Sequence, residues 1–150
     1  MAARGWEERC DVDAMTRDMM SQGMMPMAGM ESMDMAVMQA CMDACSACEQ
    51  ACTVCSGQGM ADGTMMSCAT ICMNCADMCN TMMRAMMRPM GMSMPSMMAM
   101  LDACAAMCRA CMDECMKHAE MSEVCRMCAD SCRACMQACM AMKEAVAAMA

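Results

Sequence analysis

The chain has 150 residues and a formal net charge of −8 at pH 7, and it contains 36 methionines and 19 cysteines but no phenylalanine or tyrosine. So acidic a chain lacks the basic surface that nucleic-acid binding requires, and the scarcity of β-branched and aromatic residues argues against a β-sheet. One histidine and no tyrosine leave little for acid–base catalysis, so we expect no enzyme. Abundant alanine and methionine favour α-helix.

The first 30 residues differ from the rest of the chain. Residues 1–13 carry charges and lack the apolar stretch of a signal peptide, and no uncharged apolar run reaches the roughly 18 residues that a membrane span needs. We therefore expect a cytoplasmic protein that does not bind membranes. Residues 11–21 predict a short helix ended by Gly23, followed by a methionine-rich linker at 24–30. Residues 1–30 are thus predicted to form an N-terminal extension, and residues 31–150 a single domain.

Four longer helices are predicted within that domain. They are expected at residues 32–56, from a cap at 62–64 to residue 88, at 96–118, and from a cap at Ser122 to residue 147. Gly57 and Gly59 are interpreted as the end of the first helix, and Pro89, Gly91 and Pro95 as the break between the second and the third. Four helices joined by short links predict an all-α fold, an antiparallel up-down four-helix bundle.

Eighteen of the nineteen cysteines form four runs, one in each predicted helix, and every gap within a run is three or four residues. Residues at this spacing lie on one face of a helix, and the strict alternation is that of a bundle seam. We therefore predict a cysteine-lined core, while Cys10 lies outside the pattern and has no assigned role. The eighteen candidate metal ligands are Cys41, Cys45, Cys48, Cys52, Cys55, Cys68, Cys72, Cys75, Cys79, Cys104, Cys108, Cys111, Cys115, Cys125, Cys128, Cys132, Cys135 and Cys139.

Four roles are open to these thiols: packing in the core, disulfide bonds, binding of zinc or an iron–sulfur cluster, and binding of Cu(I). Cysteine can act as a small hydrophobe, but eighteen on one seam exceed what packing needs. Cysteines four apart on one helix are poorly placed for a disulfide. Disulfides between helices are possible, but they would not require a repeated pairing along every helix. Structural zinc sites and iron–sulfur clusters favour cysteines on loops, and a divalent ion held by four thiolates would leave a net charge of −2 in the core.

Cu(I) satisfies these constraints better than the alternatives. It is soft and monovalent and prefers thiolate and thioether ligands, so one ion per shared thiolate leaves the core near neutral. Ligand sharing of this kind predicts roughly 15–20 Cu(I) ions per chain. Pairs such as Cys41/Cys45 and Cys48/Cys52 are expected as first sites. The predicted function is therefore storage of many Cu(I) ions, with general sequestration of soft metals (Zn, Cd, Hg or Ag) as the alternative.

With these cysteine runs, residues 32–147 resemble the bacterial copper storage protein family. The resemblance implies a four-helix bundle whose core cysteines bind many Cu(I) ions, and it implies assembly into a homo-oligomer, often a tetramer. It also makes a copper chaperone or a recipient protein an expected partner. The high methionine content departs from the family pattern.

The seam continues beyond the cysteines into other sulfur residues. At the end where the first helix begins, the extended seam predicts a thioether mouth; at the other end it reaches the single histidine, a candidate ligand for the last ion. Methionine also replaces leucine throughout the chain, so these side chains could simply pack. The charged residues, Glu114 among them, are interpreted as a solvated outer face. The additional candidate ligands are Met38, Met82, Met86, Met97 and Met142 at the first end, and Met65, His118 and Met121 at the second.

Overall fold

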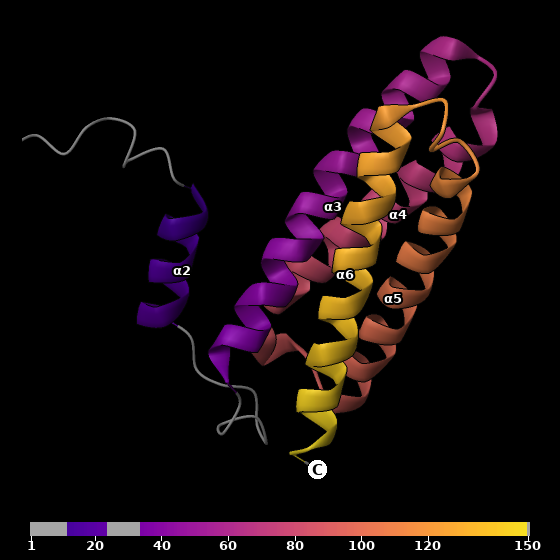
Figure 1. Ribbon diagram of the computed structural model, residues 1–150. Helices are drawn as coiled ribbons and strands as arrows, with labels where there is room; N and C mark the ends of the chain where they lie inside the picture. The colour runs from indigo at the N-terminus through magenta and orange to yellow at the C-terminus, as the bar shows by residue number, and fades with distance from the viewer. Residues whose placement is uncertain (1–11, 24–33, 150) are drawn as a thin grey trace, which may run out of the picture.

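The computed structural model of the protein describes residues 12–23 and 34–149, and within these ranges it contains helices and no β-strand. The elements are α2 (Val12–Gly23), α3 (Met35–Asp62), α4 (Met66–Met86), the 3-10 helix η1 (Pro89–Gly91), α5 (Met94–Met116) and α6 (Glu123–Ala147). The four long helices alternate in direction, and α3 packs on α4 and α6, while α5 packs on the same two neighbours (Figure 1). The predicted antiparallel four-helix bundle is confirmed.

The helix boundaries differ from the sequence-based expectation at the turn between α3 and α4. α3 does not end at Gly57 and Gly59 but continues to Asp62. Gly63 ends it instead, since its φ of 75° lies in the left-handed region and its N–H donates to the carbonyl of Gly59. Residues 62–64 therefore close α3 and provide no side-chain cap for α4, whose first residue is preceded by Met65.

Gly59 serves helix packing rather than helix termination. A Cβ atom at this position would lie 3.1 Å from the Cβ of Ala69 and 3.2 Å from the carbonyl oxygen of Met65, whereas a Cβ at Gly57 would meet nothing within 4 Å. The missing side chain thus allows α3 and α4 to approach each other closely next to their connection.

This contrast predicts opposite effects of two neighbouring substitutions. Gly57→Ala should stabilise the apo-protein by about 0.5–1 kcal/mol, because alanine is the better helix former and the position is open. Gly59→Val should destabilise it by about 1–3 kcal/mol, because the new side chain overpacks the contact with α4. Urea unfolding of both variants against the parent chain measures the two changes. Equal effects at the two positions would contradict the packing role of Gly59.

Capping side chains set the starts of three helices. The Asp34 carboxylate accepts from the Ala36 N–H at 2.9 Å, so α3 begins there rather than at residue 32. The Ser122 hydroxyl accepts from the Cys125 N–H at 3.2 Å, which confirms the predicted cap of α6. Pro95 lies in the first turn of α5, behind the cap Ser93, and so begins this helix instead of breaking the chain.

The short helix α2 confirms a helix in the N-terminal region, and Gly23 is its last residue rather than the residue after it. Arg17 lies 3.9 Å from Asp43 of α3, and Met20 packs against the bundle core. The predicted linker at 24–30 and Cys10 lie outside the described residues. Among the helices that the structure describes, none combines the length and apolar character that crossing a membrane requires.

Candidate metal centre

All eighteen seam cysteines lie in the bundle core. Each is between 0 and 2% exposed, and each is a free thiol. The alternation of three- and four-residue steps keeps each run on the inner face of its helix over its whole length. The predicted cysteine-lined core is therefore present, and it forms a column of thiols along the bundle axis.

Short contacts link these thiols mainly across helices. Sγ–Sγ distances are 3.6 Å for Cys45 and Cys135 and 3.8 Å for Cys41 and Cys139, pairs that join α3 to α6. Cys72 of α4 lies 3.6 Å from Cys111 of α5. Within one helix, contacts of this kind join Cys48 to Cys52 at 3.8 Å and Cys68 to Cys72 at 3.9 Å. The column is therefore a three-dimensional network and not four separate rows.

The network contains groups of four thiols whose Sγ atoms all lie within 4.8 Å of one another, a separation that suits a bound metal ion. Neighbouring groups share members: Cys135 belongs to two groups, as do Cys48, Cys52 and Cys132. Shared thiols are the bridging ligands that a chain of closely spaced ions requires. The groups include Cys45/Cys104/Cys135/Cys139, Cys48/Cys79/Cys108/Cys135, Cys48/Cys52/Cys75/Cys132, Cys52/Cys111/Cys128/Cys132 and Cys55/Cys68/Cys72/Cys115.

Burial opposes ionisation of these thiols in the absence of metal. Desolvation raises the pKa of the Cys68 thiol to about 12. The second cause is repulsion from the negative charge of an ionised Cys115, whose Sγ atom lies 3.7 Å from that of Cys68. The pKa of Cys79 is also raised, first by its hydrogen bond with Cys104 and then by those with Cys108 and Cys135. A bound cation reverses this balance, because it stabilises the thiolate form.

The predicted methionines at the end of the bundle where α3 begins come from all four long helices and lie in the core. Met38, Met82, Met86, Met97 and Met142 are between 0 and 2% exposed, and Leu101 and Val146 are buried with them. Thioethers do gather at this end, as the extended seam predicts. Their side chains are packed together, however, and do not line an open mouth.

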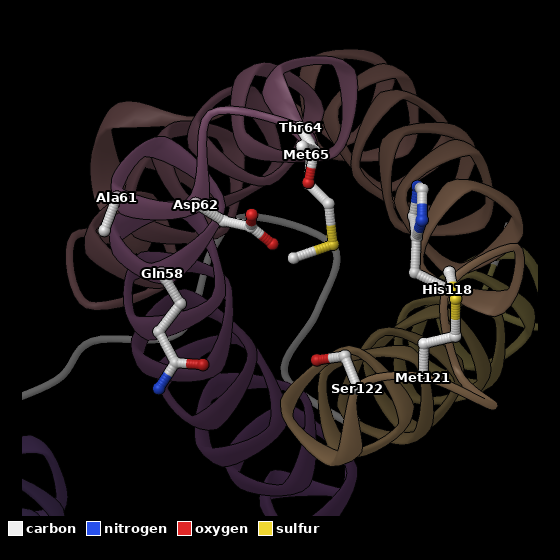
Figure 2. A pocket seen from close by; sticks show the side chains of 8 residues that line it. All are labelled: Gln58, Ala61, Asp62, Thr64, Met65, His118, Met121 and Ser122. Atoms are coloured by element: carbon white, nitrogen blue, oxygen red, sulfur yellow. The ribbon is translucent and has the colours of Figure 1, made fainter.

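The opposite end carries an open pocket of about 630 Å³ that contains the other predicted candidates. Figure 2 shows the Met65 thioether and the Asp62 carboxylate pointing into the pocket. His118 and Met121 lie across the pocket from Asp62 (Figure 2). The extended seam thus correctly brings Met65, His118 and Met121 together. The complete lining is Gln58, Ala61, Asp62, Thr64, Met65, His118, Met121 and Ser122.

The expectation that the charged residues form a solvated outer face is wrong for Glu114. This side chain is only 9% exposed. Its carboxylate accepts from Lys117 at 2.7 Å and lies 3.7 Å from the Nε2 atom of His118. The hydrogen bond from Lys117 is the main reason why the pKa of Glu114 is lowered. The four-residue spacing from Glu114 to His118 is a sequence signal for this contact, since such residues share a helix face.

Asp62 is a further site residue that the sequence analysis does not predict, since its position before Gly63 indicates only a helix cap. It lines the pocket together with the three predicted candidates. No sequence signal marks it, since the turn that brings it opposite His118 depends on how the helices pack.

A second set of thioethers, here called the outer methionines, faces solvent on the outside of the helices. Their side chains are 48–83% exposed, in contrast to the buried thiols. Met73 and Met116 directly follow the core residues Cys72 and Cys115 in the chain, so each exposed thioether lies about 100° around the same helix turn from a buried thiol. The outer methionines are Met15, Met19, Met35, Met60, Met66, Met73, Met90, Met116, Met121, Met127 and Met140.

A helical bundle with a continuous core of free, buried thiols defines a class of protein that holds many soft metal ions. Residues 34–144 match the family model described as copper storage protein. The chain belongs to the copper storage protein family, and its groups of core thiols could hold several metal ions.

Solved structures of related proteins agree in fold. The copper storage protein Ccsp from Streptomyces lividans, loaded with 10 copper equivalents, is 33% identical and superposes with a TM-score of 0.79, covering 86% of this chain and 98% of that one. A cytosolic copper storage protein from Streptomyces lividans with five coppers is 38% identical, with a TM-score of 0.70 and coverage of 73% and 93%. Comparison with curated proteins found no match.

Proposed function

We propose that the chain is a non-enzymatic, cytosolic store of Cu(I) that holds its cargo on the eighteen core cysteines. The observation that carries this proposal is the continuity of the thiol column. Adjacent groups of four thiols share Cys48, Cys52, Cys132 or Cys135, so each ion can use a thiolate that also serves its neighbour. Such sharing favours a high capacity over a few isolated sites.

Charge favours Cu(I) over divalent ions in this core. Each Cu(I) ion neutralises one thiolate, whereas a divalent ion held by four unshared thiolates leaves a net charge of −2. The thiols are buried, and no basic side chain is among the buried residues of 12–23 and 34–149, the part of the chain that the structure describes. Accumulated negative charge would therefore remain uncompensated along the column.

The related structures support a high capacity. The Streptomyces lividans protein is loaded with five coppers in one structure and with 10 copper equivalents in another. With eighteen thiols in its core, this chain is expected to hold roughly 15–20 Cu(I) ions if each thiolate bridges two ions.

We propose that copper enters through the pocket between residues 58–65 and 118–122. Thioether and imidazole are soft or intermediate ligands that can hold Cu(I) weakly, and Met65, His118 and Met121 surround the pocket. The core residues Cys55, Cys68 and Cys115 belong to the same end of the column. A mouth at the opposite end stays a prediction, and Met38, Met82, Met86, Met97 and Met142 would have to move to admit an ion there.

The four-thiol groups also favour a second candidate, zinc or cadmium sequestration. Tetrahedral zinc–thiolate sites have Zn–S bonds of about 2.3 Å, which place the sulfur atoms about 3.8 Å apart. The Sγ atoms of Cys48 and Cys132 lie 3.8 Å apart, and those of Cys52 and Cys132 lie 3.7 Å apart. Competition between the two metals therefore belongs in the test.

The test is an anaerobic titration of the reduced apo-protein with Cu(I) against a chromophoric Cu(I) chelator, in the presence and absence of excess zinc. About 15–20 ions withheld per chain, unaffected by zinc, is the expected result. Retention of only a few ions, or displacement of copper by zinc, would overturn the proposal. A triple variant, Cys48→Ser/Cys52→Ser/Cys132→Ser, should lose more than three ions, because these thiols are shared.

The same titration on Met82→Leu/Met142→Leu decides the role of the buried thioethers. Both side chains are fully buried next to the thiol column. An unchanged count assigns them to packing, and a lower count makes them ligands.

We propose that the chain forms a homo-oligomer, and chromatography with light scattering on the same samples measures this oligomeric state. A copper chaperone or recipient protein is the proposed partner.

A further inference from the structure

The seam thiols are buried in the core, whereas the outer methionines are exposed to solvent. Every seam thiol is at most 2% exposed, while the outer methionines are 48–83% exposed on the helix surfaces around them. An ordinary bundle surface would carry charged or polar side chains at such positions. The arrangement places a reducing side chain in contact with solvent and keeps the thiols behind it.

The thiol column is sensitive to oxidation because its members touch. A thiol that reacts with a peroxide forms a sulfenic acid, which condenses with a neighbouring thiol to a disulfide and water. Neighbours lie only 3.6 Å away for Cys45 and Cys135 and 3.7 Å away for Cys52 and Cys128. One oxidation event therefore removes two thiols from the column.

We propose that the outer methionines consume hydroperoxides and thereby protect the thiol column, an activity separate from copper storage. The O–O bond of the peroxide breaks, and one oxygen forms a bond to the thioether sulfur, which loses two electrons and becomes a sulfoxide. The other oxygen leaves as water from hydrogen peroxide or as an alcohol from an alkyl hydroperoxide. No metal or other reductant takes part.

The position of these methionines makes the reaction harmless to the fold. A sulfoxide is polar, and at Met73, Met127 or Met140 it meets water, since each of these side chains is about half exposed. The same product at the fully buried Met82 or Met97 would place an unpaired polar group in the core. Oxidation at the surface thus uses up oxidant while the packing of the column is preserved.

The experiment treats the reduced, full-length apo-protein with about ten equivalents of hydrogen peroxide per chain and follows each sulfur by peptide mass mapping. Thiols are counted after denaturation. We expect sulfoxide first at the outer methionines, with the core thiols still free and the helical circular dichroism unchanged. A variant in which the outer methionines other than Met121 are leucine should lose thiols about threefold faster.

A matched variant controls for methionine content. Met82→Leu/Met86→Leu/Met97→Leu/Met142→Leu removes thioethers that are fully buried, so its thiol loss in the copper-free protein should equal that of the parent chain. Equal thiol loss in the parent and in the outer-methionine variant would overturn the proposal. So would oxidation of core thiols before the outer methionines in the parent chain. Neither result would alter the copper count of the unoxidised protein, so the storage proposal is tested independently.

Discussion

Loading the reduced apo-protein with Cu(I) is expected to raise its melting temperature by more than about 15 °C, because the ions bind groups of thiols that exist only in the folded bundle. The group Cys52/Cys111/Cys128/Cys132, for example, draws its members from α3, α5 and α6. Each site held at 100 times its dissociation constant adds about 2.7 kcal/mol. Three such sites add about 8 kcal/mol, and each kcal/mol shifts the melting temperature of a domain of this size by about 2–4 °C.

Anaerobic thermal unfolding, followed by circular dichroism at increasing copper loads, measures this effect. Unfolded cysteine pairs also bind Cu(I), which reduces the gain at each site. The hard ions Mg²⁺ and Ca²⁺ provide a control, because they prefer oxygen ligands and should leave the melting temperature unchanged. A shift of less than about 3 °C at full load would place the bound copper outside the core.

Raising the pH above 9 is expected to destabilise the copper-free protein strongly. The pKa of Cys68 is raised to about 12 by its burial, while a cysteine in the unfolded chain has a pKa of about 8.5–9. At pH values below that range the Cys68 thiol keeps its proton in both the folded and the unfolded chain, and its full contribution to the stability of the fold is present. Between about pH 9 and 12 the unfolded chain releases a proton that the folded chain retains, so stability falls. Each such thiol contributes a slope of about 1.4 kcal/mol per pH unit.

Melting temperatures of the reduced apo-protein between pH 9 and 11, the range in which Cys68 loses its proton only in the unfolded chain, test this prediction. The pKa of Cys79 is raised as well, so more than one thiol should contribute to the slope. Cys68→Ala should make the slope shallower, since one of these protons is then absent. The copper-loaded protein should show little loss over the same range, because its thiols are already deprotonated. A melting temperature of the apo-protein that rises with pH would contradict the role of burial.

Much of the fold follows from residue spacing. The steps of three and four between cysteines place them on one helix face, and the predicted bounds of α3 to α6 lie within a few residues of the actual ones except at the end of α3. The prediction of the helix end at Gly57 and Gly59 was wrong, because glycine can serve either a helix end or a close contact. Only the proximity of Ala69 and Met65 distinguishes these two uses at Gly59.

The candidate site, like the fold, follows from the sequence only in part. Sequence periodicity identified all eighteen buried thiols, and it placed Met65, His118 and Met121 at one end. It missed Glu114, because a single carboxylate beside a cysteine run has the same appearance in sequence whether it is solvated or buried. Its burial depends on Lys117 and on the helix packed against it, which no periodic pattern records.

The sequence by itself determined the helices, their inner faces and the chemistry of the core, because helix geometry converts local spacing directly into a shared face. The tertiary structure alone decided which thiols form each group, since the groups combine sulfur atoms from different helices at distances set by helix packing. It also decided that Met38, Met82 and Met86 are buried at one end of the core and that the end at His118 carries an open pocket. Access depends on how side chains from four helices fill a common space, and local spacing along one chain carries no information about that.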